Sequence, residues 1–260
     1  MKYFNIMNRI YNDYIMRDRT CKLLELLIKF RDNGYIFTTI EAFAERKVKK
    51  EKIVILRHDI DTDKEYAFKL AQFEKELGIT GTYYFRLNTW DDKIIENLSE
   101  NDFEVSYHYE EIATYIKKNK IKNSLDVFTN MQEIRDECFK NIVNIRKRSG
   151  LPIKTVASHG DFINRKIGIT NTLIFKSSEF RKQCNIICEA YDYIIEGNLD
   201  IRLADRRYPE LWDKNIDEKI LKENKSIILI LIHPRQWRSN IICNFNEDIK
   251  RLIEEMKYYL

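Results

Sequence analysis

The hydrophobic pattern of this chain switches repeatedly between a repeat of two and a repeat of 3.6 residues, and this switching restricts the folds open to it. The alternation continues to the last residues without a composition break or an internal repeat. Alternating strands and amphipathic helices are typical of a parallel sheet with helical crossovers. We therefore predict one α/β domain over residues 1–260, whose sheet is either open or closed into a barrel.

Strands are predicted over residues 54–56, 82–85, 103–108, 154–157, 191–195 and 227–232. Thr62 and Glu65 have the spacing of a capping box for a helix that stops at Gly78. Further helices are expected over residues 124–149 and 247–258.

Charge and cysteine content exclude several classes of protein. The 45 basic and 41 acidic residues give a net charge of +4, and no aromatic pattern accompanies the basic clusters, so we expect no nucleic-acid partner. Residues 1–17 lack the apolar core of a signal peptide, and the longest apolar run, Ile227–Ile232, is too short to cross a bilayer. Five scattered cysteines indicate reduced thiols. We expect a cytoplasmic protein without a membrane span.

Histidines gather where predicted strands end. Of the four histidines, His58, His108 and His233 lie at or just after the carboxyl end of a strand, and His159 follows a weaker predicted strand. The carboxyl ends of parallel strands meet at one edge, so this placement allows all four to lie together.

Two carboxylates lie at the end of the first predicted strand. Asp59 and Asp61 are two residues apart in an extended segment, so their side chains point the same way as Arg57, whereas His58 points to the opposite face. Such a pair suits a cation held by one carboxylate while the other accepts a proton from water. The alternative is that both acids only cap the helix at Thr62.

The third predicted strand carries a polar face formed by Glu104, Ser106 and His108. A polar face on a buried strand needs partners, and a cavity with a metal or water would provide them. Glu110 and Glu111 follow, and are either oxygen ligands or exposed acids at a helix start.

Four short motifs, taken in order, resemble those of the polysaccharide deacetylase family, carbohydrate esterase family 4, in its branch with an Asp-x-Asp first motif. They are Arg57-His58-Asp59-Ile60-Asp61, Ser106-Tyr107-His108-Tyr109-Glu110, Ser158-His159-Gly160 and Ile232-His233-Pro234. The resemblance implies a distorted (β/α) barrel of about seven parallel strands. It also implies a divalent metal, most often zinc, and hydrolysis of an N-acetyl group on an amino sugar.

The resemblance also implies roles for single residues. Asp59 matches the catalytic base, Asp61 and His108 match metal ligands, and His233 matches the general acid. A protonated histidine beside a leaving amine and a free carboxylate beside the metal suit those two roles chemically.

The chain departs from the family pattern at one metal ligand. The family's second metal histidine falls on Ile112. His159 is the preferred substitute, Glu110 or Glu111 comes next, and loss of the metal is the remaining alternative.

Four residues are candidates for substrate binding. Arg57 lies beside the two carboxylates, and Trp237 either offers a flat surface to a sugar ring or packs in the core. The family's third motif, which contains an arginine, has no clear counterpart, and Asp205 with Arg206 is the candidate substitute.

Two other functions stay open at this point. A nucleotide-sugar glycosyltransferase would use Asp59 and Asp61 as its metal-binding pair but would leave His108 and His233 unexplained. A non-catalytic member of the fold that binds glycans or a partner protein is consistent with Ile112. The sequence does not define the oligomeric state.

Overall fold

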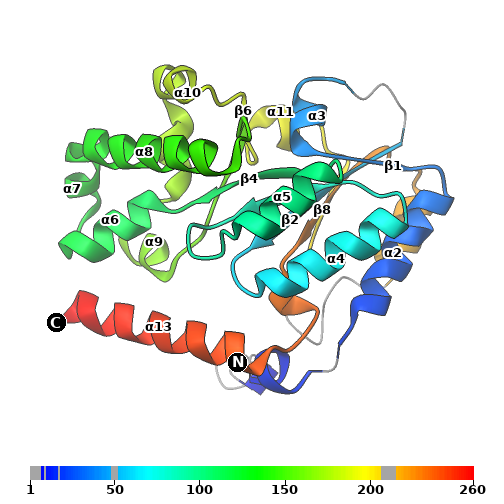
Figure 1. Cartoon of the computed structure of the whole chain (residues 1–260), viewed down its shortest axis with the longest axis horizontal. Coiled ribbons are helices and arrows are strands. Elements are labelled where there is room, and N and C mark those ends of the chain that lie inside the picture. Colours follow the sequence, from blue (N-terminus) through cyan, green and yellow to red (C-terminus); the bar gives the residue numbers. More distant parts are fainter. Residues whose placement is uncertain (1–6, 9, 17, 48–51, 206–214) are drawn as a thin grey trace.

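The computed structural model describes residues 7–8, 10–16, 18–47, 52–205 and 215–260, and a sheet of parallel strands lies at its centre (Figure 1). The strands are β1 (Ile36–Thr38), β2 (Ile53–Ile60), β3 (Thr82–Phe85), β4 (Glu104–Tyr109), β5 (Thr155–Ser158), β6 (Cys188–Glu189), β7 (Ile201–Ala204) and β8 (Ile227–Ile232). Seven of them follow the order β6-β5-β4-β3-β2-β8-β7. β2 pairs with β8 along one edge and divides its other edge between β1 and β3, always in parallel.

The sheet curls so that its inner face packs against itself. One buried cluster contains residues from β2, β3, β5, β6 and β8: Ile53, Ile55, Tyr84, Ala157, Cys188, Leu229 and Leu231. α3 (Ile40–Ala44) and α11 (Tyr193–Glu196) add Ile40 and Ile195 to this cluster. Among the described residues β6 and β7 do not pair, so the barrel is open between them. The predicted distorted (β/α) barrel is confirmed.

Helices cover the outer face of the sheet or lie at its carboxyl-terminal mouth (Figure 1). They are η1 (Tyr11–Ile15), α2 (Thr20–Asp32), α4 (Lys64–Glu76), α5 (Asp92–Glu100), α6 (Glu111–Asn119), α7 (Ser124–Thr129), α8 (Met131–Ser149), α9 (Phe162–Ile167), η2 (Asn171–Lys176), α10 (Ser178–Cys184), α12 (Ile216–Lys222), η3 (Pro234–Gln236) and α13 (Ile241–Tyr259). One core cluster lies beneath α5, α6 and α8, and another beneath α2, α4 and α12. Within the described ranges, no helix combines the length and the apolar character needed to span a bilayer.

The helix after β2 begins later than predicted. Asp63, not Thr62, is its N-cap: Asp63 has a φ of 52° and its side chain accepts from the backbone N–H of Tyr66. The helix ends before Gly78, as predicted, and the φ of 68° at Gly78 is one that glycine adopts without strain.

Three other predicted elements need correction. The helix predicted over residues 124–149 is two helices, because the side chain of Asn130 bonds back to the carbonyl of Asp126 and the backbone turns there. The strand predicted over residues 191–195 is instead the helix α11, which begins after Asp192, and Cys188–Glu189 pairs with β5. α13 begins at Ile241, ahead of the predicted residue 247.

Candidate metal centre and active site

β2 brings Arg57 and Asp59 to the inner face of the barrel, close to its carboxyl-terminal mouth. Both side chains are buried, and Arg57 binds Asp59 with two hydrogen bonds, Nε to Oδ1 at 2.7 Å and Nη2 to Oδ2 at 2.8 Å. Burial opposes ionisation of Asp59, but the charge of Arg57 and the nearby imidazoles outweighs it and lowers the pKa of this carboxyl. Asp59 is therefore held as a carboxylate.

His58 points to the opposite face of β2, as the strand period requires. Its Nε2 lies 2.9 Å from Oε1 of Glu74 on α4, and its ring stacks on Tyr83 with 4.1 Å between centroids. His58 is fully buried there. The expectation that all four histidines gather at one edge is therefore wrong for His58, which is a packing residue.

Two histidines from neighbouring strands meet Asp61. His108 lies at the end of β4 and His159 just after β5, and their rings are 5.2 Å apart. The Nε2 atom of His108 is 3.2 Å from Oδ1 of Asp61, and that of His159 is 3.5 Å from the same oxygen. The His108 and His159 side chains are almost wholly buried, whereas the Asp61 side chain is 26% exposed. Solvent therefore reaches this group of three side chains at Asp61.

The other nitrogen of each ring already has a partner. Nδ1 of His108 is 2.9 Å from the carbonyl oxygen of Ala157, and Nδ1 of His159 is 2.8 Å from Oε2 of Glu110. A carbonyl can only accept, so Nδ1 of His108 carries a proton and Nε2 is the nitrogen that faces Asp61. The geometry at His159 is the same. Oδ1 of Asp61 is itself buried without a hydrogen-bond partner among the described residues.

Two imidazole nitrogens thus face one carboxylate oxygen, which is an arrangement that a cation would satisfy. Two imidazole nitrogens and one carboxylate oxygen are a common donor set for zinc in sites that keep a position open. The side chains of Asp61, His108 and His159 therefore fit a divalent metal. Burial opposes ionisation of Asp61, but the neighbouring His159 and His108 side chains outweigh it, so the pKa of Asp61 lies well below the usual range.

Glu110 supports His159 and is not free to be a ligand. Its carboxylate accepts from Arg86 through Nε at 3.1 Å and through Nη2 at 2.8 and 2.9 Å. Burial opposes ionisation, but the bond with His159 and the charge of Arg86 lower the pKa of Glu110 to about 2. A carboxylate behind a ligand histidine fixes its tautomer and orientation. Arg86 is not among the predicted site residues, because its only signal in the sequence is its position directly after β3.

The other predicted substitutes lie away from the mouth. Glu111 points into the core, where Oε1 accepts from the Tyr107 hydroxyl at 2.6 Å and from Asn141 at 3.0 Å. Ile112, at the position of the family's second histidine, is fully buried in the core cluster beneath α6. Of the three alternatives for a third donor, His159, Glu110 and Glu111, only His159 directs toward Asp61 a donor atom that has no other partner among the described residues.

His233 follows β8 and is held by Asp205. Nδ1 of His233 is 2.7 Å from Oδ1 of Asp205, and its backbone N–H donates to Oδ2 at 2.6 Å. Nε2 of His233 lies 4.0 Å from Oδ2 of Asp59. Burial disfavours the charged ring, but the charge and hydrogen bond of Asp205 outweigh it and raise the pKa of His233 to about 10.

Three predicted substrate-binding residues have other partners. Asp205 is fully buried and also accepts from Nε1 of Trp237 at 2.9 Å, and Trp237 is itself without exposed surface, so neither can meet a sugar. Arg57 is equally buried against Asp59, with its guanidinium 4.5 Å from the ring centre of Tyr191. Arg206 lies outside the described residues.

The polar face of β4 is satisfied mainly by protein groups. Glu104 Oε2 accepts from the backbone N–H of Glu41 at 2.8 Å and from Thr82 at 2.7 Å, and Ser106 donates to the carbonyl of Thr155. The prediction that this whole face needs a metal or water is therefore wrong below His108.

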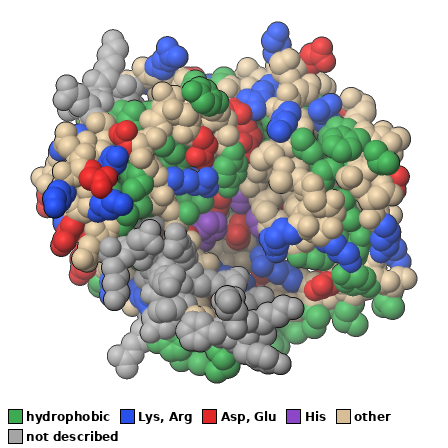
Figure 2. Space-filling view, turned by 180° about the vertical axis from the view of Figure 1, so that it is seen from behind, with side chains coloured by type: hydrophobic (Ala, Val, Ile, Leu, Met, Phe, Trp, Pro, Cys, Tyr) green, Lys and Arg blue, Asp and Glu red, His purple; other side chains and the backbone are tan. Residues whose placement is uncertain are grey.

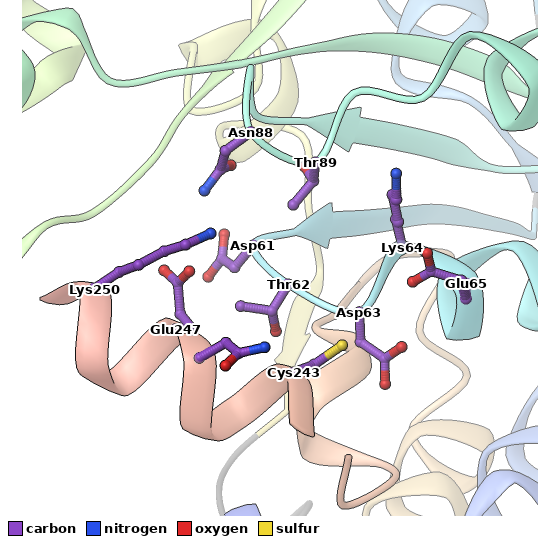
Figure 3. A pocket seen from close by; sticks show the side chains of 11 residues that line it. Asp61, Thr62, Asp63, Lys64, Glu65, Asn88, Thr89, Cys243, Glu247 and Lys250 are labelled. Carbon is purple, nitrogen blue, oxygen red and sulfur yellow. The ribbon is translucent and has the colours of Figure 1, made fainter. Parts of the chain in front are cut away.

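Three hollows lie at the mouth of the barrel. Figure 2 shows histidine and acidic side chains at the bottom of a recess in the surface. A cavity of about 70 Å³ touches Asp59, Asp61 and His233. One of about 210 Å³ lies between Asp61 and α13, with Glu247 and Lys250 pointing toward Asp61 (Figure 3). A third, of about 460 Å³, opens beside His159.

A second group of possible metal donors lies near the start of α4. Asp63, Glu65 and Cys243 bring one ligand atom each within 4.8 Å of one another. The Asp63 carboxylate already caps α4 and accepts from Asn240 at 3.0 Å. This group has fewer free donor atoms than the group at Asp61.

Comparisons with known proteins find similarity in fold at low identity. No family model and no curated protein matches the chain. A CE4 family pseudoenzyme from Bacillus anthracis is 12% identical with a TM-score of 0.43, and the match covers 80% of this chain and 61% of that one. A mutant of a CE4 family pseudoenzyme with restored enzymatic activity is 13% identical with a TM-score of 0.43, covering 79% and 65%.

A family 4 carbohydrate esterase from Bacillus anthracis is 14% identical with a TM-score of 0.40, covering 89% of this chain and 84% of that one. The chain spans only 61% and 65% of the two pseudoenzyme chains. At these values the assignment of chemistry depends on the chain's own side chains.

Proposed function

We propose that this chain is a metal-dependent hydrolase that removes an N-acetyl group from an amino sugar, in the biosynthesis of a surface polysaccharide. The observation that carries the proposal is the convergence of His108 and His159 on one carboxylate oxygen of Asp61, at 3.2 and 3.5 Å. In each ring Nδ1 carries a proton and Nε2 faces the Asp61 carboxylate. This arrangement suits a bound cation.

Asp61, His108 and His159 would hold this cation, and zinc suits the donor set best. When bound, a divalent metal polarises an amide carbonyl and makes a water molecule more acidic. The hydrogen bonds from His108 to Ala157 and from His159 to Glu110 fix the two rings in advance, which keeps the donor atoms in place.

Asp59 would act as the general base. Its pKa is lowered, so it is ionised at neutral pH, and the two bonds from Arg57 fix the position of both oxygens. Oδ2 of Asp59 lies 3.6 Å from Nε2 of His108, next to the proposed metal position but bonded to Arg57. A carboxylate in this position can take a proton from water without being a ligand.

His233 would act as the general acid. With a pKa of about 10 it carries a proton at neutral pH, and Asp205 directs the Nε2 proton toward the cavity that Asp59 also lines. A leaving amine needs such a proton when the amide bond breaks. Base and acid are thus held in opposite protonation states by different neighbours, as acid-base pairs require.

The sugar would occupy the cavity of about 460 Å³ beside His159. Gly160, Asn171 and Tyr191 line this cavity with His159, and Tyr191 offers the aromatic surface that Trp237 cannot.

The glycosyltransferase alternative fits the geometry poorly. A metal-binding Asp-x-Asp pair needs both carboxylates free, but both oxygens of Asp59 are bound by Arg57. His108 and His233 would also have no role in it.

Acetate release from N-acetylated amino sugars, free, nucleotide-linked and lipid-linked, tests the proposal. The purified chain is supplied with zinc, cobalt or nickel, and metal-dependent turnover of at least one substrate class is expected. A metal-loaded chain that binds glycans but releases no acetate across this panel would contradict the proposal and identify the non-catalytic alternative.

A further inference from the structure

The last helix, α13, turns a continuous apolar face away from the protein. Its large exposed side chains, between 39% and 87% accessible, are Ile241, Ile242, Phe245, Ile249, Leu252, Ile253, Met256, Tyr259 and the following Leu260. At 3.6 residues per turn these positions share one arc of roughly 120°. We call this set the α13 stripe.

The opposite face of α13 holds the helix on the protein. Asn244, Glu247 and Tyr258 are buried, and the Tyr258 hydroxyl donates to the carbonyl of Ile121 at 2.7 Å. The helix is therefore anchored by its polar side, and its apolar side is the one left exposed. This is the reverse of an ordinary surface helix.

The apolar surface continues onto the segment beside the start of α13. η1 contacts α13, and the Tyr14 hydroxyl donates to Asp248 at 2.6 Å. Met7, Ile10 and Ile15 in this segment are 65%, 42% and 62% exposed. Figure 1 shows the two segments side by side along one edge of the molecule. Two stretches far apart in sequence thus expose apolar side chains at the same edge. Exposed apolar residues that occur singly are ordinary, whereas a group of this kind indicates an interaction surface.

Cations lie at the carboxyl end of the α13 stripe. The Nζ atom of Lys166 is 3.6 Å from the ring centroid of Tyr259, that of Lys122 is 5.9 Å from it, and Lys257 is exposed on the helix itself. The acids nearby are partly neutralised: Glu254 binds Lys117 at 2.5 Å and Asp248 binds Arg235 at 3.1 Å, while Glu255 is exposed.

We propose that the α13 stripe docks on the surface of a lipid bilayer that contains anionic phospholipid. An apolar helix face with cations at its margin is the form that lies in a membrane interface without spanning it. A second copy of the chain fits less well, because parallel pairing of two stripes would bring their lysines together and, in either direction, an arc this wide exceeds a two-helix seam.

Docking there would place the proposed active site at the membrane. Glu247 and Lys250, from the inner side of α13, line the same cavity of about 210 Å³ as Asp61 (Figure 3). Glu247 also accepts from Arg86 at 3.4 Å, and Arg86 binds Glu110. An amino sugar carried on a membrane lipid is then the expected substrate class. This substrate class rests on the proposed function, whereas bilayer docking does not.

Co-sedimentation with vesicles tests the proposal. The full chain is mixed with vesicles of equal parts phosphatidylcholine and phosphatidylglycerol, and it is expected to sediment with them. The double variant Phe245→Ser, Leu252→Ser changes only exposed side chains. Its affinity for the vesicles should fall by about tenfold or more. The matched control Ile187→Ser, Tyr193→Ser removes two exposed apolar side chains from the opposite edge and should bind like the wild type.

Charge-reversal variants of the lysines provide a second test in the same vesicle-binding experiment. Lys166→Glu with Lys257→Glu should weaken binding by about fivefold per lysine, and added salt should weaken the wild type in the same direction. Lys140→Glu with Lys182→Glu, exposed on α8 and α10, is the control. Asp59→Asn should bind vesicles like the wild type, so vesicle binding is read independently of the proposed catalysis.

Two results would overturn bilayer docking. One is a wild type that stays in the supernatant while the stripe variant changes a dimer to a monomer in light scattering, which would assign the stripe to a second copy. The other is vesicle binding that the stripe variant leaves unchanged.

Discussion

The barrel holds two buried polar clusters at opposite ends of the same strands, and they differ in whether the protein itself satisfies them. At the amino end, Glu104 accepts from the backbone of Glu41 and from the hydroxyls of Thr82 and Thr155. At the carboxyl end, two imidazole nitrogens face Asp61 Oδ1, which has no hydrogen-bond partner among the described residues. A satisfied cluster stabilises a fold, whereas an unsatisfied one indicates a ligand.

The largest effect is expected at Asp59. Asp59→Asn keeps the shape of the side chain but removes its basicity, so the rate of acetate release should fall by about 10²–10⁴-fold. Zinc content, measured on the same samples, should stay near that of the wild type because Asp59 is bonded to Arg57. Full activity in this variant would refute the base assignment.

His233 should set the alkaline limit of activity. The acid works only while protonated, and its pKa is raised to about 10, so the rate should hold through neutral pH and fall as the pH approaches 10. Asp205→Asn removes the charge that raises this pKa, so the fall should move to lower pH. His233→Ala should lower the rate by about 10²-fold and flatten that limb. A rate-pH profile that Asp205→Asn leaves unchanged would argue against this pairing.

Glu110 should matter for metal affinity through His159. Glu110→Gln removes the carboxylate that orients the ring and should weaken zinc binding by about 10–100-fold in a competition titration with a chelator. Glu111→Gln is the matched control, because Glu111 bonds to Tyr107 in the core. His159→Ala should weaken zinc binding more than Glu110→Ala, and the reverse order would assign the ligand role to the carboxylate.

The smallest effect on zinc binding is expected at Glu104, in the cluster whose polar groups the protein itself satisfies. Glu104→Gln places an amide group where Glu104 now only accepts, so the free energy of unfolding should fall by about 1–3 kcal/mol in urea denaturation. Zinc binding should not change. A loss of zinc in this variant would show that the two clusters are not independent.

The sequence alone predicts the parts that depend on a single strand. β8 is a continuous apolar run and β2 begins with one, and the period of two correctly separates Asp59 from His58. β1 and β6 have too few residues for a periodic signal, and β7 was missed although it is as long as β3; none of these three strands was predicted at its place.

Partners from different strands could not be predicted. Arg86 with Glu110, and Asp205 with His233, depend on which strands are neighbours and how far the sheet curls. The sequence does not decide whether Trp237 binds a sugar or packs in the core. The turn η3 determines whether its ring faces the mouth or the core.

The zinc content of the purified chain tests the central account most directly. After dialysis, the wild type should retain stoichiometric zinc, because Asp61 Oδ1 has no hydrogen-bond partner among the described residues and the Nδ1 contact of His108 orients its ring toward Asp61. Asp61→Asn and His108→Ala should each lose it, with Glu104→Gln as the folded control. If both of those variants retained stoichiometric zinc, the proposed centre would be wrong.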